Sequence, residues 1–93
     1  MRELRSAIRA FHKIYILYQD SAGVETKRVI WPLLTVIFDP VQLLVGWCEL
    51  RRGFRNFRID RISGFSTLEE HFPSSKKSEL KAFLEQQRKI DDD

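Results

Sequence analysis

The sequence predicts a mostly β domain of the α+β class: a small five-stranded barrel with one helix before the strands and one after them. β-Branched and aromatic runs alternate with Gly, Pro and Asp turns between residues 13 and 68, which is typical of the short strands of small barrels. Helical spacing of apolar residues occurs only near the two ends. A barrel would also remove the edges that a small open sheet exposes.

The composition is that of a single globular domain. Of the 93 residues, 43% are hydrophobic and 31% are charged, which excludes a disordered chain. The one cysteine, Cys48, cannot form an internal disulfide, and the longest apolar run is shorter than the ~20 residues of a membrane span. No secretory signal follows Met1. We therefore expect a soluble cytoplasmic protein with no membrane partner.

The elements follow from local patterns. Apolar residues at helical spacing predict a helix over residues 2–12, and β-branched and aromatic runs predict strands at 13–19, 24–31, 33–38, 41–50, 54–62 and 65–68. Pro32 has no N–H to donate within a sheet, so we expect it to mark a strand end, an edge or a bulge between two of these runs. The predicted organisation is residues 1–73 as the barrel with its first helix, followed in the same domain by a helix and acidic tail at 74–93.

The last helix has a narrow apolar stripe and a polar end. A serine after Pro73 can cap it, and Leu80, Phe83 and Leu84 form the stripe. The three aspartates at 91–93 are expected to fray.

Basic residues are concentrated in two short stretches, although the net charge is only +3. One is residues 1–13. The other is residues 51–61, which carry five arginines against Asp60, namely Arg51, Arg52, Arg55, Arg58 and Arg61. Such clusters create a local anion-binding field. On a strand, Arg55 and Arg61 would share one face, and Arg58 and Asp60 the other.

The same segment carries a resemblance to a known family. Residues 46–62 read GWCELRRGFRNFRIDRI, which is similar to the signature of the WYL domain, where A/G-W-C-x-L-R is followed by F-R-x-F-R-[LI]-D-R-I. Residues 28–33 (RVIWPL) resemble the R-V-[IV]-x-P-x strand of that family. The resemblance covers residues 3–73. It fails where the name-giving tripeptide should stand, because residues 42–44 are Gln, Leu and Leu.

The resemblance implies an Sm-like or SH3-like five-stranded barrel that serves as the effector-sensing domain of a bacterial helix-turn-helix transcriptional regulator. It implies an anionic ligand, either single-stranded nucleic acid or a nucleotide, and a possible homodimer. A winged helix-turn-helix domain usually precedes the WYL domain. This chain has no room for one, so we expect only the C-terminal part of a regulator or a stand-alone copy.

The resemblance also favours ligand contacts for Arg55, Arg58 and Arg61, with Tyr18 beside them and Asp60 as partner of an arginine. Guanidinium groups offer forked donors to phosphate and stack on bases. Taken without the resemblance, the arginine run is typical of a solvated strand edge that discourages aggregation. Arg51 and Arg52 are expected in a solvated turn.

No catalytic, cofactor or metal motif is present in the sequence. Trp31, Trp47 and Cys48 are predicted to be core residues. His12 and His71 are expected to be isolated and without metal-ligand spacing. We therefore expect a binding module and not an enzyme. The alternative is a ligand-free dimerisation module, which the apolar stripe of the last helix and the missing Trp-Tyr pair would favour.

Overall fold

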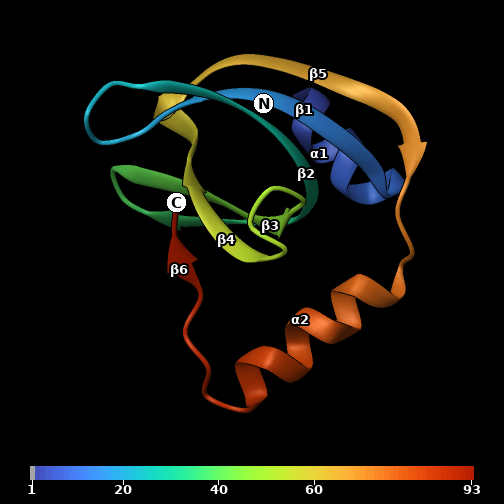
Figure 1. The fold of residues 1–93 in the computed structure, drawn as a ribbon. Coiled ribbons are helices and arrows are strands. Elements are labelled where there is room, and N and C mark those ends of the chain that lie inside the picture. The colour runs from blue at the N-terminus through green and yellow to red at the C-terminus, as the bar shows by residue number, and fades with distance from the viewer. Residues whose placement is uncertain (1) are drawn as a thin grey trace.

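A computed structural model describes residues 2–93, and it confirms a mostly β domain flanked by two helices (Figure 1). The elements in chain order are α1 (Arg2–Ala10), β1 (His12–Gln19), β2 (Glu25–Phe38), β3 (Val41–Cys48), β4 (Gly53–Arg58), the short 3₁₀ helix η1 (Ile59–Arg61), β5 (Ile62–His71), α2 (Ser75–Glu85) and β6 (Asp91–Asp92). The strands form one sheet in the order β5-β1-β2-β3-β4-β6, antiparallel except for the β4–β6 pair.

The predicted five-stranded closed barrel is not observed. Within residues 2–93 the sheet has six strands and stays open, with β5 and β6 at its two edges. The sheet nevertheless curls strongly, so that β1 and β4 contribute to one interior (Figure 1). Tyr18 of β1 meets Phe57 of β4 edge to face, with 5.1 Å between ring centroids. The helix η1 interrupts the chain between β4 and β5, where barrel closure would need continuous pairing.

Two apolar cores lie on the two faces of the curled sheet. The inner core joins α1 to the concave face and contains Leu4, Ala7, Ile14, Ile16, Tyr18, Ile30, Leu44, Cys48 and Phe57. The outer core joins α2 to the convex face and contains Leu33, Val45, Phe54, Phe72 and Leu80. Strand alternation explains the division, because successive side chains point to opposite faces. The buried position predicted for Cys48 is confirmed.

Of the three placements predicted for Pro32, the structure shows the bulge, and β2 continues through it instead of ending there. Pro32 pairs with Gly46, and the register with β3 shifts between Pro32 and Leu34. The irregularity accommodates the missing N–H and turns Leu33 toward the outer core. A glycine is required opposite this point, since a Cβ on Gly46 would lie 2.7 Å from both Ile30 Cγ2 and the Trp31 carbonyl oxygen.

The C-terminal segment also differs from expectation. The tail predicted to fray is ordered, and β6 pairs in parallel with β4 through Arg55 and Asn56. Two residues of the α2 stripe pack on this chain, with Leu80 buried in the outer core and Phe83 against it, while Leu84 is 47% exposed. No helix within residues 2–93 is long and apolar enough to cross a membrane.

The close packing at Gly46 generates a stability prediction. Gly46→Ala should lower the free energy of unfolding by about 1–3 kcal/mol, because the new methyl overpacks against backbone. Gly53→Ala is the matched control, since its Cβ would only reach ordinary contact with Arg55 at 3.6 Å. Urea denaturation of both variants checks this. Equal stabilities would contradict the tight approach of β2 to β3.

Candidate anion-binding site

Two of the predicted arginines line one cavity. The cavity has a volume of about 420 Å³ and is lined by Tyr18, Phe38, Val41, Leu43, Asn56, Arg58, Arg61, Asp92 and Asp93. The strand pattern placed Arg58 and Arg61 on opposite faces, but the chain leaves strand geometry at Ile59. Residues three apart overlie each other around a 3₁₀ turn. The turn thus brings both guanidinium groups to the same opening.

Tyr18 fixes the beginning of this turn. Its side chain is buried, and its hydroxyl oxygen accepts a hydrogen bond of 2.9 Å from the backbone N–H of Arg58. The other end of the ring packs on Phe57. Tyr18 therefore lines the cavity and positions Arg58.

Asp60 affects the cavity by pairing with the guanidinium group of Arg58. The Arg58 guanidinium donates to both carboxylate oxygens, with Nε to Oδ1 at 3.1 Å and Nη2 to Oδ2 at 2.7 Å. Hydrogen bonding by Arg58 lowers the pKa of Asp60. This forked pair orients Arg58 while its side chain stays 39% exposed. Arg61 has no salt bridge within residues 2–93.

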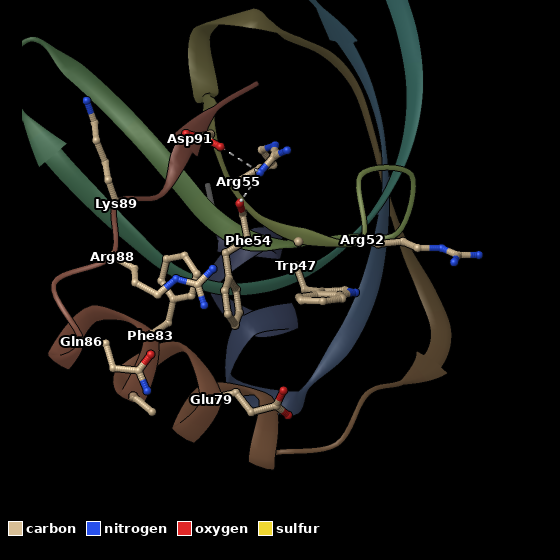
Figure 2. A pocket seen from close by; sticks show the side chains of 12 residues that line it. Trp47, Arg52, Phe54, Arg55, Glu79, Phe83, Gln86, Arg88, Lys89 and Asp91 are labelled. Atoms are coloured by element: carbon tan, nitrogen blue, oxygen red, sulfur yellow. Dashed lines mark hydrogen bonds and ion pairs between the residues drawn. The ribbon is translucent and has the colours of Figure 1, made fainter.

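Arg55 lies in a different cavity, of about 780 Å³, between β4, α2 and the tail. Its Nη1 donates to the Phe54 carbonyl oxygen at 3.1 Å and lies 3.6 Å from Asp91 Oδ2. Figure 2 shows the rings of Trp47, Phe54 and Phe83 in this cavity, with basic side chains around them. The predicted arginines therefore do not all meet in one pocket.

A second group of charged residues was missed from the sequence. Arg28 of β2 is buried, with 4% of its side chain exposed, and pairs with the Asp93 carboxylate, whose side chain is 3% exposed. Arg51 Nε donates to Asp93 Oδ1 at 3.0 Å, and Arg55 Nε lies 3.9 Å from that oxygen. We call Arg28, Arg51 and Arg55 the arginine triad.

The signal for this group was present in the strand pattern. Period-two alternation puts Arg28 on the same face as Ile30, which is buried, so Arg28 had to find an acceptor inside the fold. Arg51 was assigned to a solvated turn, and it is half exposed but ion-paired. Asp93 also lines the Arg58–Arg61 cavity. Asp93 therefore contacts the arginine triad and also borders the cavity of Arg58 and Arg61.

The two histidines are not isolated, contrary to the prediction. His12 and His71 face each other across the β1–β5 pair, with ring centroids 4.0 Å apart. His12 Nδ1 also lies 2.8 Å from the Leu68 carbonyl oxygen. Across residues 2–93, no three His, Cys, Asp or Glu side chains gather in a way that could hold a metal ion.

Comparison with models of protein families identifies the family of this chain. The model of the WYL domain matches residues 1–66. The chain belongs to the WYL domain family. A search of curated proteins finds no match.

Among solved structures, the WYL chain superimposes on proteasome accessory factor B/C (PafBC) of Arthrobacter aurescens with a TM-score of 0.73 and 23% sequence identity. The match covers 83% of this chain and 12% of the PafBC chain. At this identity the likeness shows a shared fold. It also means that this WYL domain corresponds to a small part of the PafBC chain.

The departure from the WYL tripeptide falls on the wall of the cavity. Leu43 stands where the resemblance places the tyrosine of the tripeptide, and its side chain lines the cavity with Arg58 and Arg61. An apolar group therefore replaces a hydroxyl at this wall, while Tyr18 of β1, which is not adjacent to β3 in the sheet, also lines the cavity and carries a hydroxyl.

Removing the Tyr18 hydroxyl should destabilise the domain. Tyr18→Phe leaves the Arg58 N–H without its acceptor, and the expected loss in the free energy of unfolding is about 1 kcal/mol. Tyr15→Phe in the same strand is the control, with an expected change near zero because no hydrogen bond of the Tyr15 hydroxyl is found within residues 2–93. Chemical denaturation compares the two, and equal losses would contradict the positioning role.

The Arg58–Asp60 pair predicts a pH dependence. Because the pKa of Asp60 is lowered in the folded state, the pair stabilises the fold above the unfolded pKa of that carboxyl. This stabilisation is lost as the pH falls through the folded pKa. In an NMR titration, Arg58→Gln should move the Asp60 transition to higher pH, whereas Arg2→Gln on α1 should leave it unchanged. An unshifted transition in Arg58→Gln would show that the pair does not form in solution.

Proposed function

We propose that this WYL domain is the effector-sensing domain of a bacterial transcriptional regulator, and that it binds single-stranded nucleic acid through Arg58 and Arg61. The convergence of these two side chains on one cavity carries the proposal. Both come from a single turn, and Arg58 is held in place by Tyr18 and Asp60. A preset pair of guanidinium groups suits two successive phosphates or a phosphate and a base.

The cavity combines charge with flat apolar surface. The ring of Phe38, at the β2–β3 connection, is 64% exposed and lines the same cavity as Arg58 and Arg61. Exposed aromatic rings beside basic groups are the usual means of binding single strands, since bases stack on the ring while phosphates meet the cations. This combination favours an oligonucleotide over a small inorganic anion.

Arg55 has a supporting role in this proposal. It lies on the far side of Asp93 from the cavity residues, beside the aromatic surface of Trp47, Phe54 and Phe83. A strand of several nucleotides could extend from one cavity to the other along β4. Asp60 would not touch the ligand, because both of its oxygens accept hydrogen bonds from Arg58.

Binding would act on a winged helix-turn-helix domain, in the same polypeptide or in a partner, by shifting the population of its arrangements. We propose no catalytic activity. The apolar stripe of α2 gives less support to the dimerisation alternative, because Leu80 and Phe83 pack on this chain's own sheet and do not need a second copy.

Titration with a short single-stranded oligonucleotide at several salt concentrations tests this function. Arg58→Ala and Arg61→Ala should each weaken binding about tenfold, a loss of about 1.4 kcal/mol. Each should also reduce the slope of log affinity against log salt by about 0.7 for the lost phosphate contact. Arg2→Ala, which removes the same charge from the exposed face of α1, is the matched control.

Two outcomes would refute the proposal. One is no binding by the wild-type chain even at low salt. The other is equal affinity in the Arg2, Arg58 and Arg61 variants, since binding would then depend on overall charge and not on the cavity.

A further inference from the structure

Arg28 of the arginine triad lies where strand alternation would ordinarily place an apolar side chain. Arg28 shares the inner face of β2 with Ile30 and is almost fully buried. An arginine remains protonated in proteins, so burial cannot be relieved by loss of the proton. Its charge therefore needs an acidic group within the fold.

That group comes from the C-terminal tail. The Asp93 carboxylate pairs with Arg28 through one oxygen, and the other accepts a hydrogen bond from Arg51 at 3.0 Å. Arg55 approaches the second oxygen at 3.9 Å, which is beyond hydrogen-bond distance. The backbone N–H of Asp93 donates to the Asn56 carbonyl oxygen at 3.0 Å and holds the residue against β4.

One carboxylate does not satisfy this group of donors. The buried Nε of Arg28 has no hydrogen-bond partner within residues 2–93. Three guanidinium charges face one buried carboxylate, and Asp91, the other acidic contact of Arg55, is 73% exposed and 3.6 Å away. A phosphate group has more acceptor oxygens than a carboxylate and suits forked donors equally well. The triad thus has capacity for a phosphate that Asp93 leaves unused.

We propose that the arginine triad is a subsite for a phosphate group and that residues 91–93 are its internal occupant, which the ligand displaces. The ligand is that of the proposed function, on which this inference rests, but the subsite consists of other residues. Asp93 also lines the Arg58–Arg61 cavity. The cavity therefore adjoins the position of the Asp93 carboxylate, where we place the next phosphate of the same strand.

The tail is attached in a way that permits displacement. β6 contributes only Asp91 and Asp92 to the sheet, and residues 86–90 connect it to α2. A short tether maintains a local concentration on the order of millimolar, so the tail outcompetes free anions but not a ligand with several contacts. If the tail leaves the subsite empty about a tenth of the time or less, it weakens the apparent affinity of a competitor by about tenfold or more.

Comparison of Asp93→Asn with Glu85→Gln tests the inference. Both variants remove one negative charge from the C-terminal part of the domain. Glu85 is the exposed last residue of α2, lines neither cavity and has no salt bridge within residues 2–93. Isothermal titration with inorganic phosphate and with a short single-stranded oligonucleotide should show Asp93→Asn binding both at least about tenfold more tightly than wild type, and Glu85→Gln within about twofold of wild type.

The two probes and the arginine variants separate this inference from the proposed function. Equal affinities of Asp93→Asn and Glu85→Gln for both probes would overturn the tail as occupant, even if Arg58→Ala and Arg61→Ala still weaken oligonucleotide binding. Tighter phosphate binding by Asp93→Asn, with no effect of the Arg58 and Arg61 variants, would support the subsite and refute the cavity. Tightening for the oligonucleotide alone would overturn the subsite for a single phosphate group.

Hydrogen exchange on the wild-type chain gives a second measurement that does not depend on the folding of any variant. The Asp93 amide is protected by its bond to the Asn56 carbonyl oxygen. A saturating oligonucleotide should raise its exchange rate at least about tenfold, because displacement breaks that bond. Unchanged protection at saturation would overturn displacement of the tail.

Discussion

The buried charge of Arg28 is the constraint on which the arrangement of the site depends. It stands on the inner face of β2, where the neighbouring side chains are apolar, and its partner Asp93 is equally buried. Pairs of this kind add little net stability compared with apolar side chains, but loss of one partner costs about 3–5 kcal/mol. The pair therefore determines where the tail lies more than how stable the domain is. Through it, β2 and β6 are connected across the mouth of the curled sheet.

The same open end of the sheet explains why the basic residues are accessible. A barrel closed between β4 and β5 would continue strand pairing through residues 59–61, and the side chains there would alternate between faces. The 3₁₀ turn replaces this pairing, and the Tyr18 hydroxyl satisfies the N–H of Arg58 that strand pairing would otherwise use. The turn thus both ends the sheet and gathers Arg58 and Arg61 at one opening.

Membership of the WYL family agrees with a binding surface built on this opening, but the chain differs from the family signature at the cavity wall. Leu43 offers no hydroxyl, so the recognition that we propose would depend on guanidinium groups and on the exposed side chain of Phe38. Such a surface would favour phosphate contacts and base stacking over discrimination between bases. In the same proposal, the acidic tail carries charge of the same sign as the ligand and would compete with it for the arginine triad.

The sequence by itself determined the elements with strong local periodicity and the family. These depend on neighbours a few residues apart, as in α1 and the stripe of α2. Only the tertiary structure decided that β2 runs through Pro32, that Arg58 and Arg61 share a cavity without Arg55, and that Asp93 is buried on Arg28. These features depend on contacts between distant segments. The partner of a buried charge is the acidic group that the fold brings next to it, and a local sequence pattern does not show which group that is.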